Sequence, residues 1–144
     1  MATLEPETGL VIRYHYLWQR QALAGEETGR KARPVCVVIP IGAKGADVVL
    51  FPLTTQPPGP DRLAVQVPET ERRRLRLKGD GPAWIILDEG NRDELPGSSH
   101  LEPVALNPVR FHYGVFSPVF MRIVLTTLAQ GIRAQRLKVV SRGE

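Results

Sequence analysis

Two polar positions beside apolar runs carry the side chains with the clearest chemical potential. Arg33 precedes the run 34–39, and Thr54 follows the run 47–53. If these runs form an antiparallel hairpin, the start of the first lies beside the end of the second, so both residues share one sheet edge. A guanidinium is a planar fork of donors that matches phosphate oxygens. Taken alone, the commoner explanation is a strand threonine and an arginine that points at water.

A second group of cations lies within the segment 71–78, which holds five positive groups and one negative group. Its arginines are Arg72, Arg73, Arg74 and Arg76. They could contact RNA phosphates, or they could form the solvated face of a short helix. The formal net charge of +4 permits an anionic partner without requiring one.

The histidines and the cysteine form no metal-binding or redox motif. His15, His100 and His112 show no metal-ligand spacing with acids or cysteine. Cys36 is the single cysteine, which excludes an internal disulfide framework and a cysteine-cluster zinc site. Its place in an apolar run predicts a small buried hydrophobe. We therefore predict no metal site and no cofactor.

Composition favours many short strands in one domain of 144 residues, covering 1–144. Hydrophobic residues make up 42% and charged residues 24%, a globular composition, while 13 glycines and 13 prolines supply many turns. The segments 19–32 and 88–108 are polar and are expected to be irregular. Apolar runs and alternation predict strands over 9–18, 34–39, 47–53, 63–67, 83–87 and 110–116.

Two segments carry helix signals. The segment 68–77 has proline in its first turn and early acids, as a short helix requires. Ser117-Pro118 is a cap followed by a first turn, and Gly131 is the expected stop. The wide apolar face of this second helix indicates core packing, a subunit contact, or both. Together these elements predict a small, mostly antiparallel β-barrel or curled sheet carrying one or two helices.

The chain shows no targeting or membrane-spanning pattern. Residues 1–10 are acidic and polar, unlike a secretory signal. No apolar run approaches the roughly 18 residues that a membrane span needs. We therefore expect a cytoplasmic protein without membrane association.

Several short motifs occur in an order that resembles a known family. Gly9-x-Val11-Ile12 is followed by Gly25-Glu26-Glu27-Thr28-Gly29, then by Lys31-Ala32-Arg33-Pro34 with its apolar strand, and then by Pro52-Leu53-Thr54-Thr55-Gln56. The later stretch 83–89, an apolar strand ending in Asp88-Glu89, fits the same series. In this order the motifs resemble the MazF/PemK family of bacterial toxins, the growth-inhibiting halves of type II toxin–antitoxin modules.

The resemblance implies an SH3-like antiparallel β-barrel, of the mostly-β (α+β) class, with a short internal helix and a C-terminal helix. It also implies a homodimer that cleaves single-stranded RNA sequence-selectively without a metal, leaving 2′,3′-cyclic phosphate and 5′-hydroxyl ends. The family's catalytic pair carries over to Arg33 and Thr54, and the base of some members to Asp88. The expected partner is a cognate antitoxin with an acidic, disordered segment.

The remaining assignments concern RNA contacts and the general base. His15 is an alternative base on pKa grounds, and the resemblance favours Asp88. Two other functions stay open: a non-catalytic toxin of the same fold that inhibits a protein such as DNA gyrase, and a plain RNA-binding module. Candidate RNA contacts are His15, Arg30, Lys31, Thr55, Gln56, Arg72, Arg73 and Arg74.

Overall fold

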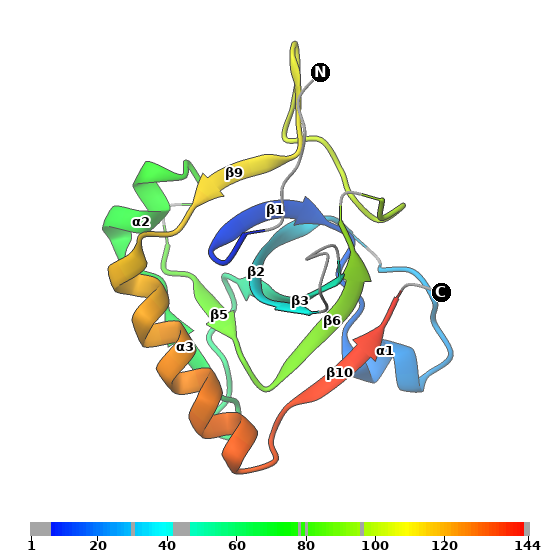
Figure 1. Cartoon of the computed structure of the whole chain (residues 1–144), viewed down its shortest axis with the longest axis vertical. Helices are drawn as coiled ribbons and strands as arrows, with labels where there is room; N and C mark the ends of the chain where they lie inside the picture. The colour runs from blue at the N-terminus through cyan, green and yellow to red at the C-terminus, as the bar shows by residue number, and fades with distance from the viewer. Residues whose placement is uncertain are drawn as a thin grey trace.

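A strongly curled β-sheet forms the centre of the molecule, and the helices lie around it (Figure 1). The computed structural model describes residues 7–29, 31–41, 47–77, 79, 81–95 and 97–142. In chain order the elements are β1 (Leu10–Tyr14), α1 (Gln19–Leu23), β2 (Arg33–Ile41), β3 (Asp47–Thr54), β4 (Ala64–Gln66), α2 (Glu69–Arg74), β5 (Trp84–Ile86), β6 (Glu89–Glu94), β7 (Ala105–Leu106), β8 (Val109–Arg110), β9 (His112–Val115), α3 (Pro118–Arg133) and β10 (Lys138–Ser141).

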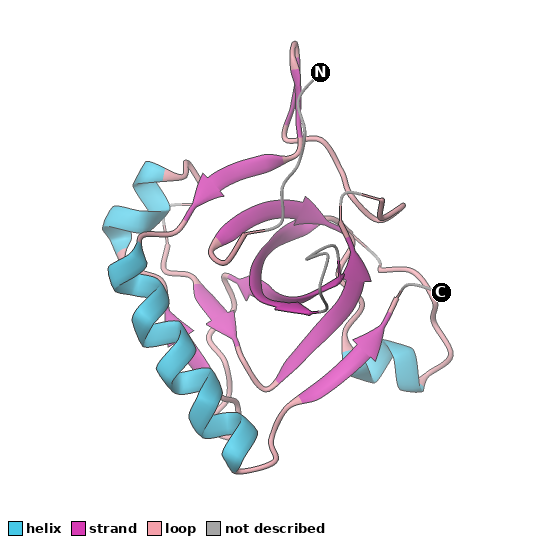
Figure 2. Ribbon diagram, viewed as in Figure 1, coloured by secondary structure: helices cyan, strands magenta, loops and turns pink. Residues whose placement is uncertain are grey.

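The strand pairing confirms the mostly-β, α+β class (Figure 2). The main path runs β10–β6–β3–β2–β1–β9, with β5 pairing β3 and β4, and β7 and β8 form a separate hairpin. Every pairing is antiparallel except that of β10 with β6. Within the described ranges, no ladder joins the end strands β9 and β10. The sheet is therefore curled and not closed into the expected barrel.

Strand β3 changes partner near its end. It pairs with β6 up to Leu50, opposite Asn91, and with β5 from Leu53, opposite Ile85. Pro52, which has no N–H to donate, lies in the gap between these two ladders. Because β3 continues past its pairing with β6, its last residue, Thr54, reaches the sheet's rim.

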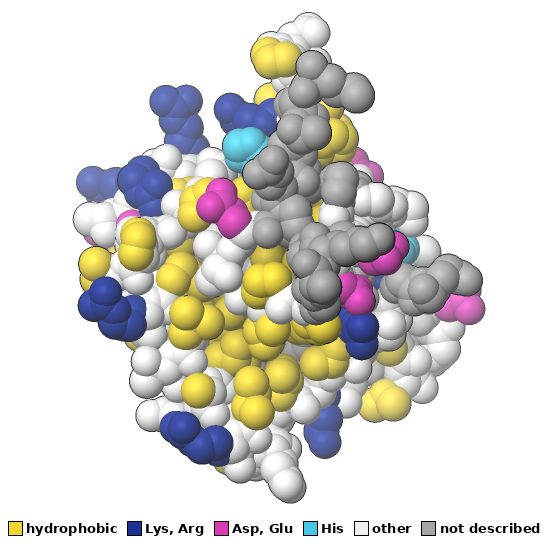
Figure 3. Space-filling view, in the orientation of Figure 1, with side chains coloured by type: hydrophobic (Ala, Val, Ile, Leu, Met, Phe, Trp, Pro, Cys, Tyr) yellow, Lys and Arg dark blue, Asp and Glu magenta, His cyan; other side chains and the backbone are white. Residues whose placement is uncertain are grey.

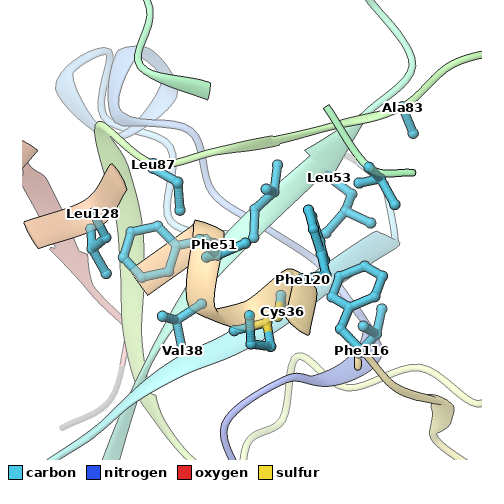
Figure 4. Close-up of a cluster of buried hydrophobic side chains, with 14 of the residues drawn as sticks. Cys36, Val38, Phe51, Leu53, Ala83, Leu87, Phe116, Phe120 and Leu128 are labelled. Carbon is cyan, nitrogen blue, oxygen red and sulfur yellow. The ribbon is translucent and has the colours of Figure 1, made fainter. Parts of the chain in front are cut away.

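Successive residues of a strand point to opposite faces of the sheet, and each face packs into its own hydrophobic cluster. In β2, Cys36 and Val38 belong to the cluster that α3 covers, and the alternating residues Val35 and Val37 belong to the other. Figure 4 shows the first cluster, in which Phe116 and Phe120 meet edge-to-face at 5.0 Å. Cys36 is fully buried, and this burial raises the pKa of its thiol.

Both predicted helices are present, with corrected boundaries. Helix α2 is shorter than the predicted 68–77, because it spans Glu69–Arg74 with Pro68 before its first residue. Helix α3 begins after Ser117, whose hydroxyl accepts the Phe120 amide at 3.2 Å. Gly131 does not end α3, because the helix continues to Arg133. A Cβ atom at Gly131 would instead collide with the Leu63 side chain, so the glycine permits close packing. In the described part of the chain, no helix has the length and apolarity to cross a membrane.

Two segments expected to be irregular contain regular structure. The segment 19–32 includes the single-turn helix α1, and the segment 88–108 includes β6. The inward side chains of β6 are Glu89, Asn91 and Asp93, all buried although polar. Hydrophobic alternation therefore could not reveal this strand, because hydrogen bonds rather than apolar contacts hold its buried side.

Candidate functional site

The open end of the β2–β3 hairpin brings Arg33 and Thr54 together. The hairpin register pairs Val35 with Pro52 and Cys36 with Phe51. Continued by two residues, the same register sets Arg33, the first residue of β2, across from Thr54, the last of β3. Residues 42–46, which connect the two strands, lie outside the described residues. The juxtaposition expected from the sequence is therefore present in the structure.

Two adjoining hollows meet at this hairpin end. The first hollow, of about 650 Å³, has Tyr16, Trp18, Arg20, Arg62 and the segment 54–59 in its walls. The second hollow, of about 480 Å³, is walled by Arg13, Pro34, Leu77 and Tyr113, among others. The residues common to both hollows are Lys31, Arg33, Thr54 and Thr55.

Arg33 is a half-buried cation that has no acidic partner among the described residues. Its Cζ lies 5.2 Å from the centroid of the Trp18 ring, a cation–π contact. Its Nε is buried and has no hydrogen-bond partner. Burial, and secondarily the charge of Arg20, lower the pKa of the Arg33 guanidinium. A buried donor left unpaired costs about 1–3 kcal/mol, so this Nε adds no stabilising hydrogen bond and the guanidinium could serve an anionic ligand.

The support for Arg33 comes from the segment between β1 and α1. Trp18 is 7% exposed, precedes α1, and meets the Tyr16 ring edge-on at 5.0 Å. The Asn91 side chain accepts the Leu17 amide at 2.9 Å and donates to the Leu17 carbonyl at 2.8 Å. Buried Asn91 thus fixes the backbone on which the Trp18 ring stands.

Thr54 has a hydroxyl whose hydrogen is free to donate. Its Oγ1 accepts the backbone amide of Gln56 at 3.1 Å, which fixes the oxygen's position at the mouth of both hollows. A hydroxyl can accept one bond and donate another at the same time. Thr55 and Gln56, two predicted RNA contacts, are exposed and line the first hollow, as does Lys31.

Asp88 is engaged elsewhere. Its carboxylate accepts three hydrogen bonds of 2.7–3.1 Å from Arg62 and one of 3.0 Å from the Leu63 amide. It lines a third hollow of about 410 Å³ and neither of the first two. Arg62, in contrast, lines both the first and the third hollow. Asp88 therefore shares no hollow with Arg33 or Thr54, and the residues that line both its hollow and the first one are Arg20 and Arg62.

The alternative base, His15, lines none of the three hollows. Its Nε2 lies 2.8 Å from the Glu102 carboxylate, and its carbonyl accepts Arg142 at 2.7 Å. Tyr14 and Tyr16, on either side of it in the sequence, are buried, so the His15 side chain points to the opposite side of the chain. The structure therefore does not bring His15 to the hairpin end.

The arginine run of α2 is largely occupied by local partners. Arg73 pairs with Glu69, and Arg74 pairs with Glu71 and donates to the Val115 carbonyl at 2.7 Å. Arg72 donates to the Gly79 carbonyl at 3.3 Å. None of the three lines the described hollows, and their predicted RNA contacts stay predictions. The predicted contact at Arg30 lies outside the described residues.

Three residues of the site were not singled out from the sequence: Trp18, Arg20 and Arg62. Arg20 lies over the same Trp18 ring as Arg33, with its Cζ 5.0 Å from the ring centroid. An aromatic residue and a basic residue two positions apart are too common a pattern to mark a site. Among the described residues, no group of three or more His, Cys, Asp or Glu side chains could hold a metal ion.

We compared the sequence with protein-family models and with curated proteins. No protein-family model matches the chain, and no curated protein matches it.

Proposed function

We propose that this chain is a metal-independent endoribonuclease that cleaves single-stranded RNA, and that it is the toxin of a type II toxin–antitoxin module of the MazF/PemK kind. One observation carries the proposal: the half-buried Arg33, with its unpaired Nε, shares two hollows with the Thr54 hydroxyl. The order of sequence motifs around these two residues supports the family assignment.

RNA can be cut without a metal because its own 2′-hydroxyl attacks the adjacent phosphorus. The new 2′-O–P bond replaces the P–O5′ bond, so the products carry a 2′,3′-cyclic phosphate and a 5′-hydroxyl. The proton from the 2′-hydroxyl leaves to a base, and the departing 5′-oxygen gains a proton. Charge accumulates on the two non-bridging oxygens, and stabilising that charge is the largest task left to the protein.

Arg33 and Thr54 fit that task. The Arg33 fork can donate to both phosphoryl oxygens, and Thr54 can donate one further bond. One preorganised donor contributes about 3 kcal/mol to transition-state stabilisation. Because Asp88 binds Arg62, we assign Asp88 the role of a positioning residue for the first hollow. Lys31, Thr55 and Gln56 line the same hollow and are assigned to RNA contacts.

The wider assembly follows the same proposal. We propose that the curled sheet is an open variant of the family's SH3-like barrel. A second copy of the chain is proposed to cover α3, where Val119 is 67% and Ile123 51% exposed. Figure 3 shows hydrophobic side chains gathered at the centre of the face seen in Figure 1, beside α3, with lysines and arginines toward its rim. The cognate antitoxin is proposed to present an acidic segment that competes with RNA for the hollows.

The test is cleavage of a mixed-sequence RNA by the purified protein in EDTA, with mapping of both product ends. We expect cyclic phosphate and 5′-hydroxyl ends, and no cutting when the 2′-hydroxyl at the cut site is replaced by hydrogen. Arg33→Met should abolish cleavage, and Thr54→Val should lower its rate about 10²–10³-fold. Arg110→Met and Thr70→Val are matched controls, because both residues are exposed and line none of the three hollows. Binding without cleavage would reassign the chain to the RNA-binding class.

A further inference from the structure

The first and third hollows are joined by two arginines. Arg20 and Arg62 line both of them. Beyond this junction the third hollow carries two more cations, Lys138 and Arg136, the latter 4.0 Å from Asp88, together with the acids Asp61, Asp88 and Glu89. Since Arg33 lies where the first and second hollows meet, a chain of basic side chains follows the three hollows from end to end.

The two junction arginines differ in whether their charge is already matched. Arg62 donates to both oxygens of Asp88 at 2.7–3.1 Å and to Glu89 at 3.0 Å. Arg20 is exposed, and within the described residues its side chain forms neither a hydrogen bond nor an ion pair. Arg62 is therefore neutralised by the fold, whereas the charge of Arg20 is available to a ligand.

Arg20 and Arg33 are held against the same aromatic ring. Their Cζ atoms lie 5.0 and 5.2 Å from the centroid of Trp18. The charge of Arg20 contributes to the lowered pKa of Arg33, so the two guanidiniums repel each other in the free protein. Within the described part of the chain neither guanidinium has an acidic partner, so anionic groups that bind beside the ring reduce the repulsion between the two charges.

We propose that Arg20 binds the phosphate next to the one held at Arg33, and so leads a single nucleic-acid strand from the first hollow into the third. This inference rests on the proposed function, since it takes the Arg33 phosphate as the reacting one. Arg20 then supplies binding to substrate and transition state alike, and it does not act on the reacting atoms. Its loss should raise KM and leave kcat nearly unchanged.

The first experiment measures binding of a short single-stranded DNA, which has no 2′-hydroxyl and is not cut. Binding is followed by Trp18 fluorescence in a Trp84→Phe background over a series of salt concentrations. Each phosphate contact on a single strand contributes about 0.7 to the slope of log affinity against log salt. Arg20→Gln should reduce this slope by about 0.7. Arg110→Gln removes the same charge from exposed β8, which lines none of the hollows, and should leave the slope unchanged.

The second experiment measures RNA cleavage by the same variants. Arg20→Gln should raise KM several-fold with kcat within about twofold of wild type, whereas Arg33→Gln should lower kcat. An unchanged salt slope in Arg20→Gln, or no binding of single strands by the wild type, overturns the role of Arg20. A reduced slope in a protein that cuts no RNA supports the Arg20 contact and rejects the proposed function. The two ideas therefore fail separately.

Discussion

Arg62 and Asp88 form a bidentate pair at the junction of the first and third hollows, where Arg62 lines both and Asp88 lines the third. Arg62 Nη2 lies 2.7 Å from Asp88 Oδ1, and Arg62 Nε lies 3.0 Å from Asp88 Oδ2. The Asp88 side chain is only 12% exposed, and it also caps the Leu63 amide. With partners on both oxygens, the Asp88 carboxylate stabilises the fold at the edge of the site.

Asp88→Asn should destabilise the protein more than it damages catalysis. The amide removes the charge that Arg62 needs, and we expect the free energy of unfolding to fall by about 1–3 kcal/mol. Urea denaturation measures this loss. Asp47→Asn is the control, since the pair of Asp47 with Arg92 is exposed and its loss should change little. If the variant instead loses the acidic limb of the pH–rate profile, Asp88 is the general base.

Arg33→Met should abolish cleavage without lowering stability. Met keeps an apolar contact with the Trp18 ring while removing a charge that burial and Arg20 disfavour. The expected free energy of unfolding is therefore within about 1 kcal/mol of wild type, or higher. Arg62→Met is the matched comparison, because it strands Asp88 and Glu89 and should cost about 1–3 kcal/mol. A large loss of stability in Arg33→Met would show that Arg33 is a structural residue.

Two substitutions at Thr54 distinguish the role of its hydroxyl from that of its methyl group. Thr54→Val should lower kcat about 10²–10³-fold, the typical effect of losing one preorganised donor. Thr54→Ser keeps the oxygen that accepts the Gln56 amide and should retain most of the activity. Single-turnover cleavage rates measure both effects. Equal activity of the Val and Ser variants would remove the hydroxyl from the mechanism.

The sequence predicted the hairpin end because each part of it obeys a local rule. The runs before Thr54 and after Arg33 are apolar and β-branched, so their pairing and the juxtaposition of the two residues follow from hairpin geometry. The helix α3 was equally accessible through its Ser117-Pro118 start. These elements can be predicted without knowing which parts of the chain they pack against.

The other half of the site depends on contacts distant in sequence. Strand β6 buries Glu89, which accepts the Tyr16 hydroxyl at 3.0 Å across 73 positions of sequence. The Arg62–Asp88 pair likewise joins residues 26 positions apart. No local pattern marks a polar residue as buried until its partner is placed, so α1, β6 and the roles of Trp18 and Arg20 appeared only in the structure.

The exposed side of α3 gives a prediction about assembly. Ile123 is 51% and Val119 67% exposed, one helical turn apart. If a second copy covers them, Ile123→Glu should convert a dimer into a monomer, because an interface cannot bury an unpaired carboxylate cheaply. Sedimentation velocity measures the change. Thr70→Glu, on exposed α2, is the control for added charge. A wild-type protein that is monomeric at every concentration would reject the dimer.

His100 predicts how stability depends on pH. Its Nδ1 lies 2.9 Å from the Arg142 guanidinium, which also donates to the carbonyl of His15 and lies over the ring of Tyr14. Burial first, then the Arg142 charge and more weakly His15, lower the pKa of His100 below 6.5, while Asp93 opposes them. Between the lowered pKa and 6.5, the unfolded chain binds a proton that the folded chain refuses. The His100 contribution to stability is therefore present above pH 6.5 and is lost as the pH falls through that window.

The slope of unfolding free energy against pH in this window should include up to about 1.4 kcal/mol per pH unit from this one proton. His100→Gln keeps an oxygen that can accept Arg142 but cannot titrate, so it should flatten the slope below pH 6.5 and leave stability above it nearly unchanged. Arg142→Gln should flatten it in part, because removing that charge brings the pKa of His100 closer to its ordinary value. Urea denaturation at several pH values checks both variants. A slope that survives unchanged in His100→Gln would assign the acid sensitivity to other groups.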